Sequence, residues 1–337
     1  MDYSGLIKLA SGHVEARIVQ AALELRIFET LESHALEAVS VANSLNLEPR
    51  ATELMLNALT ALGLLCKREA RFSLTDVSAR YLQRSAPGYL GDMIRFEASL
   101  WHCWTSLTEA IRSGRPVRAA NMYQDNPKET AIFIDAMDSL VKARGDAEIM
   151  AEVFDWDNAR ELLDVGSGPA TYPISLCQRF SNLRATIFDL PATLALTEGY
   201  VREAGLTSRI RLISGDYRVD EVPGNYDVIF LSNIIHSESF EVNQRLILNL
   251  SSVLEPGGSV MVKDHILDST RINPPAGALF SLLMLLTTQA GRCYAFDEVE
   301  AWMSAAGLTH IRQIDLPAPL NSSLIMATKG EHVTNSC

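Results

Sequence analysis

The segment Glu161-Leu-Leu-Asp-Val-Gly-Ser-Gly168 decides the fold of this 337-residue chain. Its apolar run is typical of a buried parallel strand, and the two glycines after it predict a sharp turn into a helix. Glycine adopts backbone dihedrals closed to other residues and lets a ligand approach the main chain closely. In a doubly wound sheet, nucleotide-like ligands bind at such a turn after the first strand. The segment therefore predicts an α/β domain with a nucleotide-type site.

A second apolar segment, residues 184–190, supports this interpretation because Asp189 lies near its end. An acidic residue there is placed to accept hydrogen bonds from ribose hydroxyls, in NAD and in S-adenosylmethionine alike. The full dinucleotide fingerprint needs a further glycine or alanine where this chain has Thr171. The turn therefore leaves both cofactors open and disfavours NAD.

Strand-like and helix-like segments then alternate: strands at residues 209–216, 226–233 and 258–264, and helices at 173–180, 192–204 and 243–254. This alternation predicts a parallel sheet with right-handed crossovers. The last two strand-like runs, 310–316 and 321–328, are separated by only four residues. So short a link permits an antiparallel hairpin but no parallel crossover. An antiparallel last strand favours an S-adenosylmethionine methyltransferase over a dehydrogenase.

Five motifs resemble the caffeic-acid and hydroxyindole type of O-methyltransferase: Leu163-Asp-Val-Gly-Ser-Gly168, Phe188-Asp-Leu-Pro191, Ser214-Gly-Asp-Tyr217, Asn233-Ile-Ile-His236 and Leu254-Glu-Pro-Gly-Gly258. The resemblance is collinear over nearly the whole chain, and the second and third motifs are its most specific part. It implies a winged-helix dimerisation domain at residues 1–88, a helical linker at 89–150 that contributes to the acceptor pocket, and a class I, Rossmann-like methyltransferase domain at 151–330.

The resemblance also implies roles for single residues. The cofactor S-adenosyl-L-methionine would be held by Gly166, Ser167 and Gly168 at its methionine part, Asp189 and Leu190 at the ribose, Gly215, Asp216 and Tyr217 at the adenine, and the backbone near Ser232. His236 matches the family's general base. Trp104 and Met137, on helix-like segments at 93–111 and 133–140, would contact the acceptor, although such stripes also form ordinary core.

Methyl transfer to oxygen requires that the acceptor lose its proton, and His236 follows a strand whose carboxyl end should face the cofactor. A phenol has a pKa near 10 in water, so a neutral imidazole beside it can take its proton. A nearby carboxylate would stabilise the imidazolium that forms. Alternation along the strand places Lys263 and His265 on one face and Asp264 on the other. Either His265 or Asp264 could face the pocket, and we favour Asp264. The alternatives are that His236 only caps a strand–helix junction and that Asp264 is only a turn residue at the end of its strand.

Two departures from the family pattern concern the acceptor side. Ser237 follows His236 where the family usually has aspartate, and Cys293 occupies the position of a second family acid. A thiol cannot replace a carboxylate at neutral pH unless it is strongly activated. The predicted function is therefore O-methylation of an aromatic or conjugated hydroxyl compound. A C-methyltransferase or a non-methylating relative is the alternative.

The first ninety residues predict a winged helix, with helices at 18–31, 38–45 and 49–62 and a two-stranded wing at 63–75. DNA binding is disfavoured because the net charge is −12 and the helix at 49–62 carries only Arg50 against Glu53. Its apolar face, with Leu54, Leu56 and Leu59, is better explained by burial against another chain. We therefore expect a homodimer and no nucleic-acid partner, and a ligand-responsive regulator is disfavoured.

The remaining composition is that of an ordinary globular protein, with 47% hydrophobic and 21% charged residues. No apolar run reaches the roughly 18 residues of a membrane span, and no signal-peptide pattern is found. The five cysteines are scattered and lack Cys-x-x-Cys spacing, which favours the cytoplasm and argues against structural zinc. We expect no metal and no membrane partner.

Overall fold

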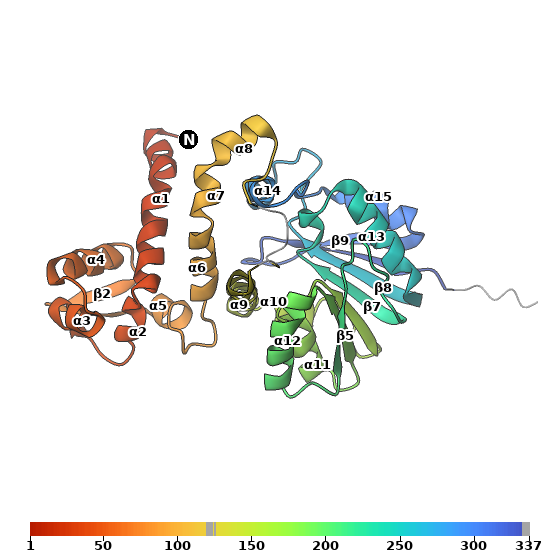
Figure 1. Cartoon of the computed structure of the whole chain (residues 1–337), viewed down its shortest axis with the longest axis horizontal. Helices are drawn as coiled ribbons and strands as arrows, with labels where there is room; N and C mark the ends of the chain where they lie inside the picture. The colour runs from red at the N-terminus through yellow and green to blue at the C-terminus, as the bar shows by residue number, and fades with distance from the viewer. Residues whose placement is uncertain (119–123, 125, 332–337) are drawn as a thin grey trace, which may run out of the picture. The chain divides into compact units, whose positions relative to one another are not determined.

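The computed structural model describes residues 1–118, 124 and 126–331 (Figure 1). The chain folds into two compact units: Met1–Trp101 with Asp135–Ala143, and His102–Ile134 with Arg144–Cys337. The predicted linker, residues 89–150, is divided between the two units. No helix among the described residues is long and apolar enough to cross a membrane.

The first unit is mainly helical, with a small antiparallel sheet of order β1-β3-β2. Its elements are α1 (Tyr3–Glu24), α2 (Ile27–Thr30), β1 (Leu36–Glu37), α3 (Ala38–Leu45), α4 (Pro49–Ala61), β2 (Leu65–Arg68), β3 (Arg71–Leu74), α5 (Asp76–Tyr81) and α6 (Gly91–Ser99). The predicted second and third helices and the wing are confirmed. Pro49 begins α4, where its missing N–H costs no helical hydrogen bond.

The first helix differs from its predicted span of residues 18–31. It begins at Tyr3, where the Asp2 side chain accepts a hydrogen bond from the Gly5 N–H at 2.8 Å. It ends at Glu24, and Arg26 then adopts a left-handed conformation with φ 61°. The prediction was wrong at both ends. Almost all of residues 1–17 are exposed, so no core-facing stripe marks this part of the helix.

Two further sequence interpretations need correction. Leu56 and Leu59 of α4 are fully buried in the core of their own unit, whereas Leu54 is 58% exposed. Burial of that whole face against another chain is therefore wrong. The segment 93–111 was predicted to be one helix but forms three, α6, α7 (Trp101–Thr105) and α8 (Leu107–Ser113). Its apolar spacing continues across the breaks, so the sequence pattern does not reveal them.

The second unit contains a seven-stranded sheet of order β6-β5-β4-β7-β8-β10-β9. Its strands are β4 (Glu161–Val165), β5 (Arg184–Asp189), β6 (Ile210–Ser214), β7 (Tyr226–Ser232), β8 (Leu254–Asp264), β9 (Leu308–Asp315) and β10 (Ser323–Lys329). The pairs among β4 to β8 are parallel, and β10 runs antiparallel to both β8 and β9. The predicted parallel sheet and carboxyl-terminal hairpin are confirmed.

Helices accompany these strands, and those that follow β4 in the chain connect them. They are α9 (Pro127–Arg144, shared between the units), α10 (Asp146–Met150), α11 (Thr171–Arg179), α12 (Pro191–Glu203), α13 (Phe240–Ser252), α14 (Pro275–Thr287) and α15 (Phe296–Ala305), with a 3₁₀ turn η1 (Ile235–Ser237). Figure 1 shows α11 and α12 on one face of the sheet and α13 and α15 on the other. Because β4 to β8 are parallel, their carboxyl ends meet along one edge of the sheet. Binding sites of this architecture lie at that edge.

Candidate active site

The glycine turn after β4 has the left-handed backbone that its sequence predicts. Gly166 and Gly168 have φ values of +68° and +61°. The Gly166 N–H donates to the Phe188 carbonyl at 2.9 Å, which ties the turn to β5. A Cβ atom on Gly166 would lie 2.3 Å from Cδ1 of Ile234. The turn therefore needs glycine for its dihedrals and for the space.

Asp189 lies at the end of β5, directly beside this turn. Its Oδ2 accepts a hydrogen bond from the Gly168 N–H at 2.9 Å, and its Oδ1 accepts one from the Leu190 N–H at 2.7 Å. Burial raises the pKa of Asp189 to about 6. Each carboxylate oxygen accepts more than one hydrogen bond. The fixed carboxylate can therefore accept further bonds from a diol.

Sequence reasoning did not single out Asp164, although it belongs to the deciding segment. Burial raises the pKa of its carboxyl to about 7. The Ser167 hydroxyl donates to its Oδ2 at 2.6 Å, whereas its buried Oδ1 has no hydrogen-bond partner among the described residues. Such an orphaned acceptor is costly, and the ammonium group of a bound amino acid would satisfy it. The turn thus fits the methionine part of S-adenosylmethionine.

The predicted adenine residues already have protein partners. The carboxylate of Asp216 binds the guanidinium of Arg218 at 2.7 to 3.1 Å, and this hydrogen bonding lowers the pKa of Asp216. The hydroxyl of Tyr217 donates to Glu238 Oε1 at 2.9 Å. A Cβ atom on Gly215 would lie 2.2 Å from the Phe188 ring. This corner is therefore closely packed, and its side chains are oriented by their partners.

Ser232 occupies the last position of β7, where the resemblance places a backbone contact. The next residue, Asn233, has a left-handed backbone with φ 58° and donates its side-chain amide to Ser232 Oγ at 3.1 Å. The Asn233 N–H also donates to the Lys263 carbonyl at 2.8 Å. These bonds fix the backbone where β7 ends and the turn carrying His236 begins.

His236 and Asp264 are brought together by two neighbouring strands. His236 lies on η1 just after β7, and Asp264 is the last residue of β8. Nδ1 of His236 lies 2.8 Å from Oδ1 of Asp264, with both side chains buried. Burial alone would raise the pKa of Asp264, but its contacts with His236 and His265 outweigh this and lower it. The carboxylate is therefore ionised and acts only as an acceptor.

His265 approaches the same group by a different route. Its N–H donates to Asp264 Oδ1 at 2.7 Å, and its ring Nδ1 lies 2.9 Å from the Asn321 carbonyl oxygen. The rings of His236 and His265 both pack on Phe280, with centroids 4.8 and 4.7 Å away. Burial lowers the pKa of His265. Of the two predicted alternatives, Asp264 is the one whose side chain binds His236.

The other face of β8 carries a buried ion pair that the sequence did not reveal. Nζ of Lys263 lies 3.0 Å from Asp146 Oδ2, and both side chains are fully buried. Arg144 binds the same carboxylate through Nε at 2.9 Å and Nη2 at 2.7 Å, and the Tyr172 hydroxyl donates to it at 3.0 Å. Burial lowers the pKa of Lys263. Lys263 and Asp264 thus point to opposite faces, as strand alternation predicts.

Cys293 is buried on the side of Asp264 and is packed with Leu267, Ala295 and Phe280. Burial, together with the charge of Asp264, raises the pKa of its thiol to about 12. Its N–H donates to Ser281 Oγ at 3.1 Å. The thiol is therefore neutral and cannot act as an acid or a base there.

The two predicted acceptor-binding residues lie in different units. Trp104 is half-buried on α7 and belongs to the second unit, which also contains His236. Met137 is half-buried on α9 in the first unit. Their contact with an acceptor stays a prediction.

Comparisons with known proteins identify the family of the chain. The O-methyltransferase domain matches residues 104–309, and the O-methyltransferase dimerisation domain matches residues 7–84. The chain is 30% identical to 3-hydroxy-5-methyl-1-naphthoate 3-O-methyltransferase of Streptomyces sahachiroi, over 96% of this chain and 94% of that protein. It is 29% identical to L-tyrosine C(3)-methyltransferase of Streptomyces lavendulae, over 98% and 93%.

Among solved structures, human N-acetylserotonin methyltransferase in complex with S-adenosylmethionine superposes with a TM-score of 0.87 over 98% of this chain and 99% of that one, at 23% identity. At this identity the likeness concerns the fold alone. Together with the domain matches and the relatives that span the whole chain, it shows that the protein belongs to the O-methyltransferase family of S-adenosylmethionine-dependent methyltransferases.

Proposed function

We propose that the protein transfers the methyl group of S-adenosylmethionine to a hydroxyl group of an aromatic or conjugated small molecule, with His236 as the general base. The observation that carries this proposal is the 2.8 Å contact between His236 Nδ1 and Asp264 Oδ1 at the carboxyl ends of β7 and β8. It supports an oriented imidazole at the edge of the sheet where the cofactor-type turn lies.

The cofactor would be held by groups that the structure already orients. The backbone of Gly166 and Gly168 and the free Oδ1 of Asp164 suit the methionine part, and Asp189 suits the ribose. The bound cofactor supplies an electrophilic methyl group. The chain's own contribution is to align the acceptor oxygen with that methyl group, which can provide several kcal/mol of the barrier.

The pair of His236 and Asp264 determines which imidazole nitrogen can accept a proton. Because the Asp264 carboxylate only accepts hydrogen bonds, His236 must donate its proton from Nδ1. Nε2 then carries the free lone pair and takes the proton of the acceptor hydroxyl. The imidazolium that forms is stabilised by Asp264 in a buried setting, where charge interactions are strong. A base of this kind typically contributes about 10²- to 10⁴-fold to the rate.

The aromatic nature of the acceptor is supported by the relatives. Their names specify a hydroxynaphthoate, tetracenomycin and acetylserotonin as the compounds or pathways concerned. The side chains near the base also suit an apolar ring. Phe280 packs against the His236 ring, and the thiol of the neighbouring Cys293 is neutral.

We also propose that the protein works as a homodimer formed through its first domain, which matches the dimerisation domain of the family. On α1 the side chains of Tyr3, Leu6, Leu9 and Val14 are between 48% and 80% exposed. An exposed apolar set of this kind is typical of a protein–protein contact. The domain limits at residues 88 and 150 stay part of this proposal, as do the absence of nucleic-acid binding and the cytoplasmic location.

One alternative has a specific observation in its favour. The relative from Streptomyces lavendulae is named as a C-methyltransferase of tyrosine and is as similar over its length as the O-methyltransferases. Carbon methylation beside a phenol also begins with removal of the phenolic proton. The position of the new methyl group therefore distinguishes the two functions.

The test is a screen of phenols and naphthols with methyl-labelled S-adenosylmethionine, followed by NMR of each labelled product. The proposal predicts a methoxy product and at least a hundredfold lower kcat in His236→Ala, with unchanged binding of S-adenosylhomocysteine. A methyl group on ring carbon would replace the proposal by the alternative. An active His236→Ala variant would remove the assigned base.

A further inference from the structure

The turn that carries His236 has little hydrogen bonding of its own. η1 spans only Ile235–Ser237, and its short-range bonds are Ser237 N–H to the Ile234 carbonyl at 3.0 Å and Glu238 N–H to the Ile235 carbonyl at 3.4 Å. The 3₁₀ geometry is intrinsically poorer than that of an α-helix. The position of the imidazole therefore depends on groups outside the turn.

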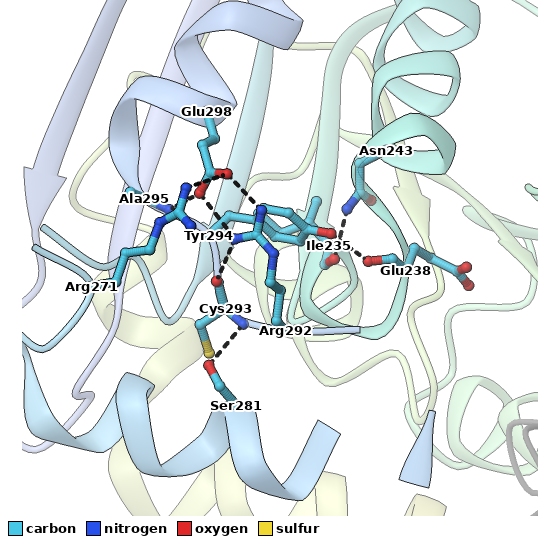
Figure 2. A network of polar contacts seen from close by, with 10 residues as sticks. All are labelled: Ile235, Glu238, Asn243, Arg271, Ser281, Arg292, Cys293, Tyr294, Ala295 and Glu298. Atoms are coloured by element: carbon cyan, nitrogen blue, oxygen red, sulfur yellow. Dashed lines mark hydrogen bonds and ion pairs between the residues drawn. The ribbon is translucent and has the colours of Figure 1, made fainter. Parts of the chain in front are cut away.

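Three of these groups contact the backbone of the turn, as Figure 2 shows for two of them. The Asn243 amide donates to the Ile235 carbonyl at 2.8 Å, and the Tyr294 hydroxyl donates to the Glu238 carbonyl at 2.6 Å. Gly291 packs so closely that a Cβ atom there would lie 2.4 Å from the His236 carbonyl oxygen. The carbonyls on both sides of His236 are therefore held by side chains.

Tyr294 lies beside a polar network centred on Glu298 of α15 (Figure 2). The Arg292 guanidinium lies 4.2 Å from the centre of the Tyr294 ring and binds Glu298 at 2.6 and 3.1 Å. Glu298 also accepts a hydrogen bond from the Ala295 N–H at 3.0 Å and forms an ion pair with Arg271 at 3.2 Å. The ring that carries the Tyr294 hydroxyl therefore packs against a guanidinium that Glu298 holds in place.

The same turn is tied on its other side to the predicted cofactor residues. Glu238 accepts through its side chain from Tyr217 at 2.9 Å and through its backbone carbonyl from Tyr294. Glu238 thus joins two tyrosines from different parts of the domain. It ends the segment that begins with the base, so a displacement at Glu238 moves His236.

We infer that Tyr294 is a positioning residue for His236: its hydroxyl, on a ring packed against the Arg292 guanidinium, fixes the backbone turn that aims the imidazole. The inference rests on the proposed role of His236 as the base. It does not require that Tyr294 touch the acceptor or the cofactor.

The matched pair of variants is Tyr294→Phe and Tyr226→Phe. Both tyrosines are 1% exposed, and both hydroxyls donate to a backbone carbonyl at 2.6 Å, that of Tyr226 to Pro223. Tyr226 begins β7, at the end of the strand opposite to His236. Both variants remove a hydroxyl that donates to a backbone carbonyl, and Tyr226→Phe also removes a 3.5 Å contact with the Arg211 guanidinium. Only Tyr294→Phe removes such a donor beside the base.

Two measurements on the full-length protein, saturated with S-adenosylhomocysteine or cofactor, test whether Tyr294 positions His236. The first is the ¹⁵N-histidine NMR signal of the His236 Nδ1–H proton, identified by its loss in His236→Ala. The second is kcat with the best phenolic acceptor of the screen. We expect Tyr294→Phe to shift or broaden the signal and to lower kcat about tenfold, since a 1 Å misplacement of a reacting group can cost on the order of 10²-fold and a smaller one costs less. The dissociation constant for S-adenosylhomocysteine should change less than twofold.

Tyr226→Phe should lose similar stability but keep both the signal and kcat. If Tyr294→Phe behaves as Tyr226→Phe in the NMR signal, the inference is overturned. An active His236→Ala would instead overturn the proposed function, and the NMR comparison would still show whether Tyr294 orients the ring.

Discussion

His236 and Asp264 are 28 residues apart in the sequence, yet their Nδ1 and Oδ1 atoms lie 2.8 Å apart. The contact follows from the topology, because η1 and Asp264 lie at the carboxyl ends of the adjacent parallel strands β7 and β8. The carboxylate is 1% exposed, so water does not compete for the imidazole proton. This pair is the chemical centre of the proposed site.

Asp264→Asn should disable the base while keeping the shape of the site. An amide in place of the carboxylate can donate a hydrogen bond to Nδ1. The imidazole would then carry its proton on Nε2 and could no longer accept one there. We expect kcat to fall on the order of 10²- to 10⁴-fold, with binding of S-adenosylhomocysteine retained. Steady-state kinetics with calorimetric titration will check this, and near wild-type kcat would exclude the orienting role.

Gly166→Ala should damage the glycine turn. The new methyl group would lie 2.3 Å from Cδ1 of Ile234, at a φ of +68°. We expect a loss of about 2–4 kcal/mol in unfolding free energy and much weaker binding of S-adenosylhomocysteine. The control is Gly199→Ala in α12, where a Cβ atom meets nothing within 4 Å. It should instead stabilise the fold by about 0.5–1 kcal/mol. Equal effects of the two changes would refute this account of the turn.

Cys293 should resist thiol reagents in the folded protein. It is 2% exposed, and burial raises its pKa to about 12, whereas Cys66 on β2 is exposed. Only thiolates react rapidly. Timed alkylation followed by peptide mass spectrometry should label Cys66 early and Cys293 only after unfolding. Early labelling of Cys293 would mean that the packing around its thiol is open.

Asp164 should make the cofactor-free protein less stable as the pH rises. Burial raises its pKa from 3.8 to about 7, so the folded chain holds a proton that the unfolded chain releases. The resulting stability is fully present below about pH 4 and lost as the pH rises through about 7. The difference in unfolding free energy between Asp164→Asn and the wild type should therefore shift in favour of the variant by on the order of 3 kcal/mol between pH 4 and pH 8. Denaturant titrations at both pH values will measure this. The control is Asp157→Asn at an exposed position, and an equal gain there would contradict the burial argument.

Much of the second domain could be predicted because its signals are local. The apolar run ending at Gly166, the acid at Asp189 and the four-residue link before the last strand each correspond to one structural feature. Strand alternation also placed Asp264 and Lys263 on opposite faces. The contact between His236 and Asp264 followed once the strand order was known.

Other features depend on tertiary partners that leave no local signal. The ion pair of Lys263 and Asp146 joins residues 117 positions apart, and nothing in either segment indicates the other. The pairing of Tyr294 with the Glu238 carbonyl has the same character. Similarly, the amino-terminal part of α1 is exposed and lacks a core-facing stripe, and the breaks after Ser99 and Thr105 interrupt a continuous apolar spacing.

The most direct test of the central claim is the pH dependence of kcat for wild type and His236→Ala with one phenolic acceptor. The account predicts that the wild type has a high kcat at pH 7, because the imidazole accepts the proton of the phenol. The variant should be at least a hundredfold slower at pH 7. Its kcat should recover only as the pH approaches the pKa of the free phenol, near 10. Superimposable profiles for the two proteins would contradict His236 as the base.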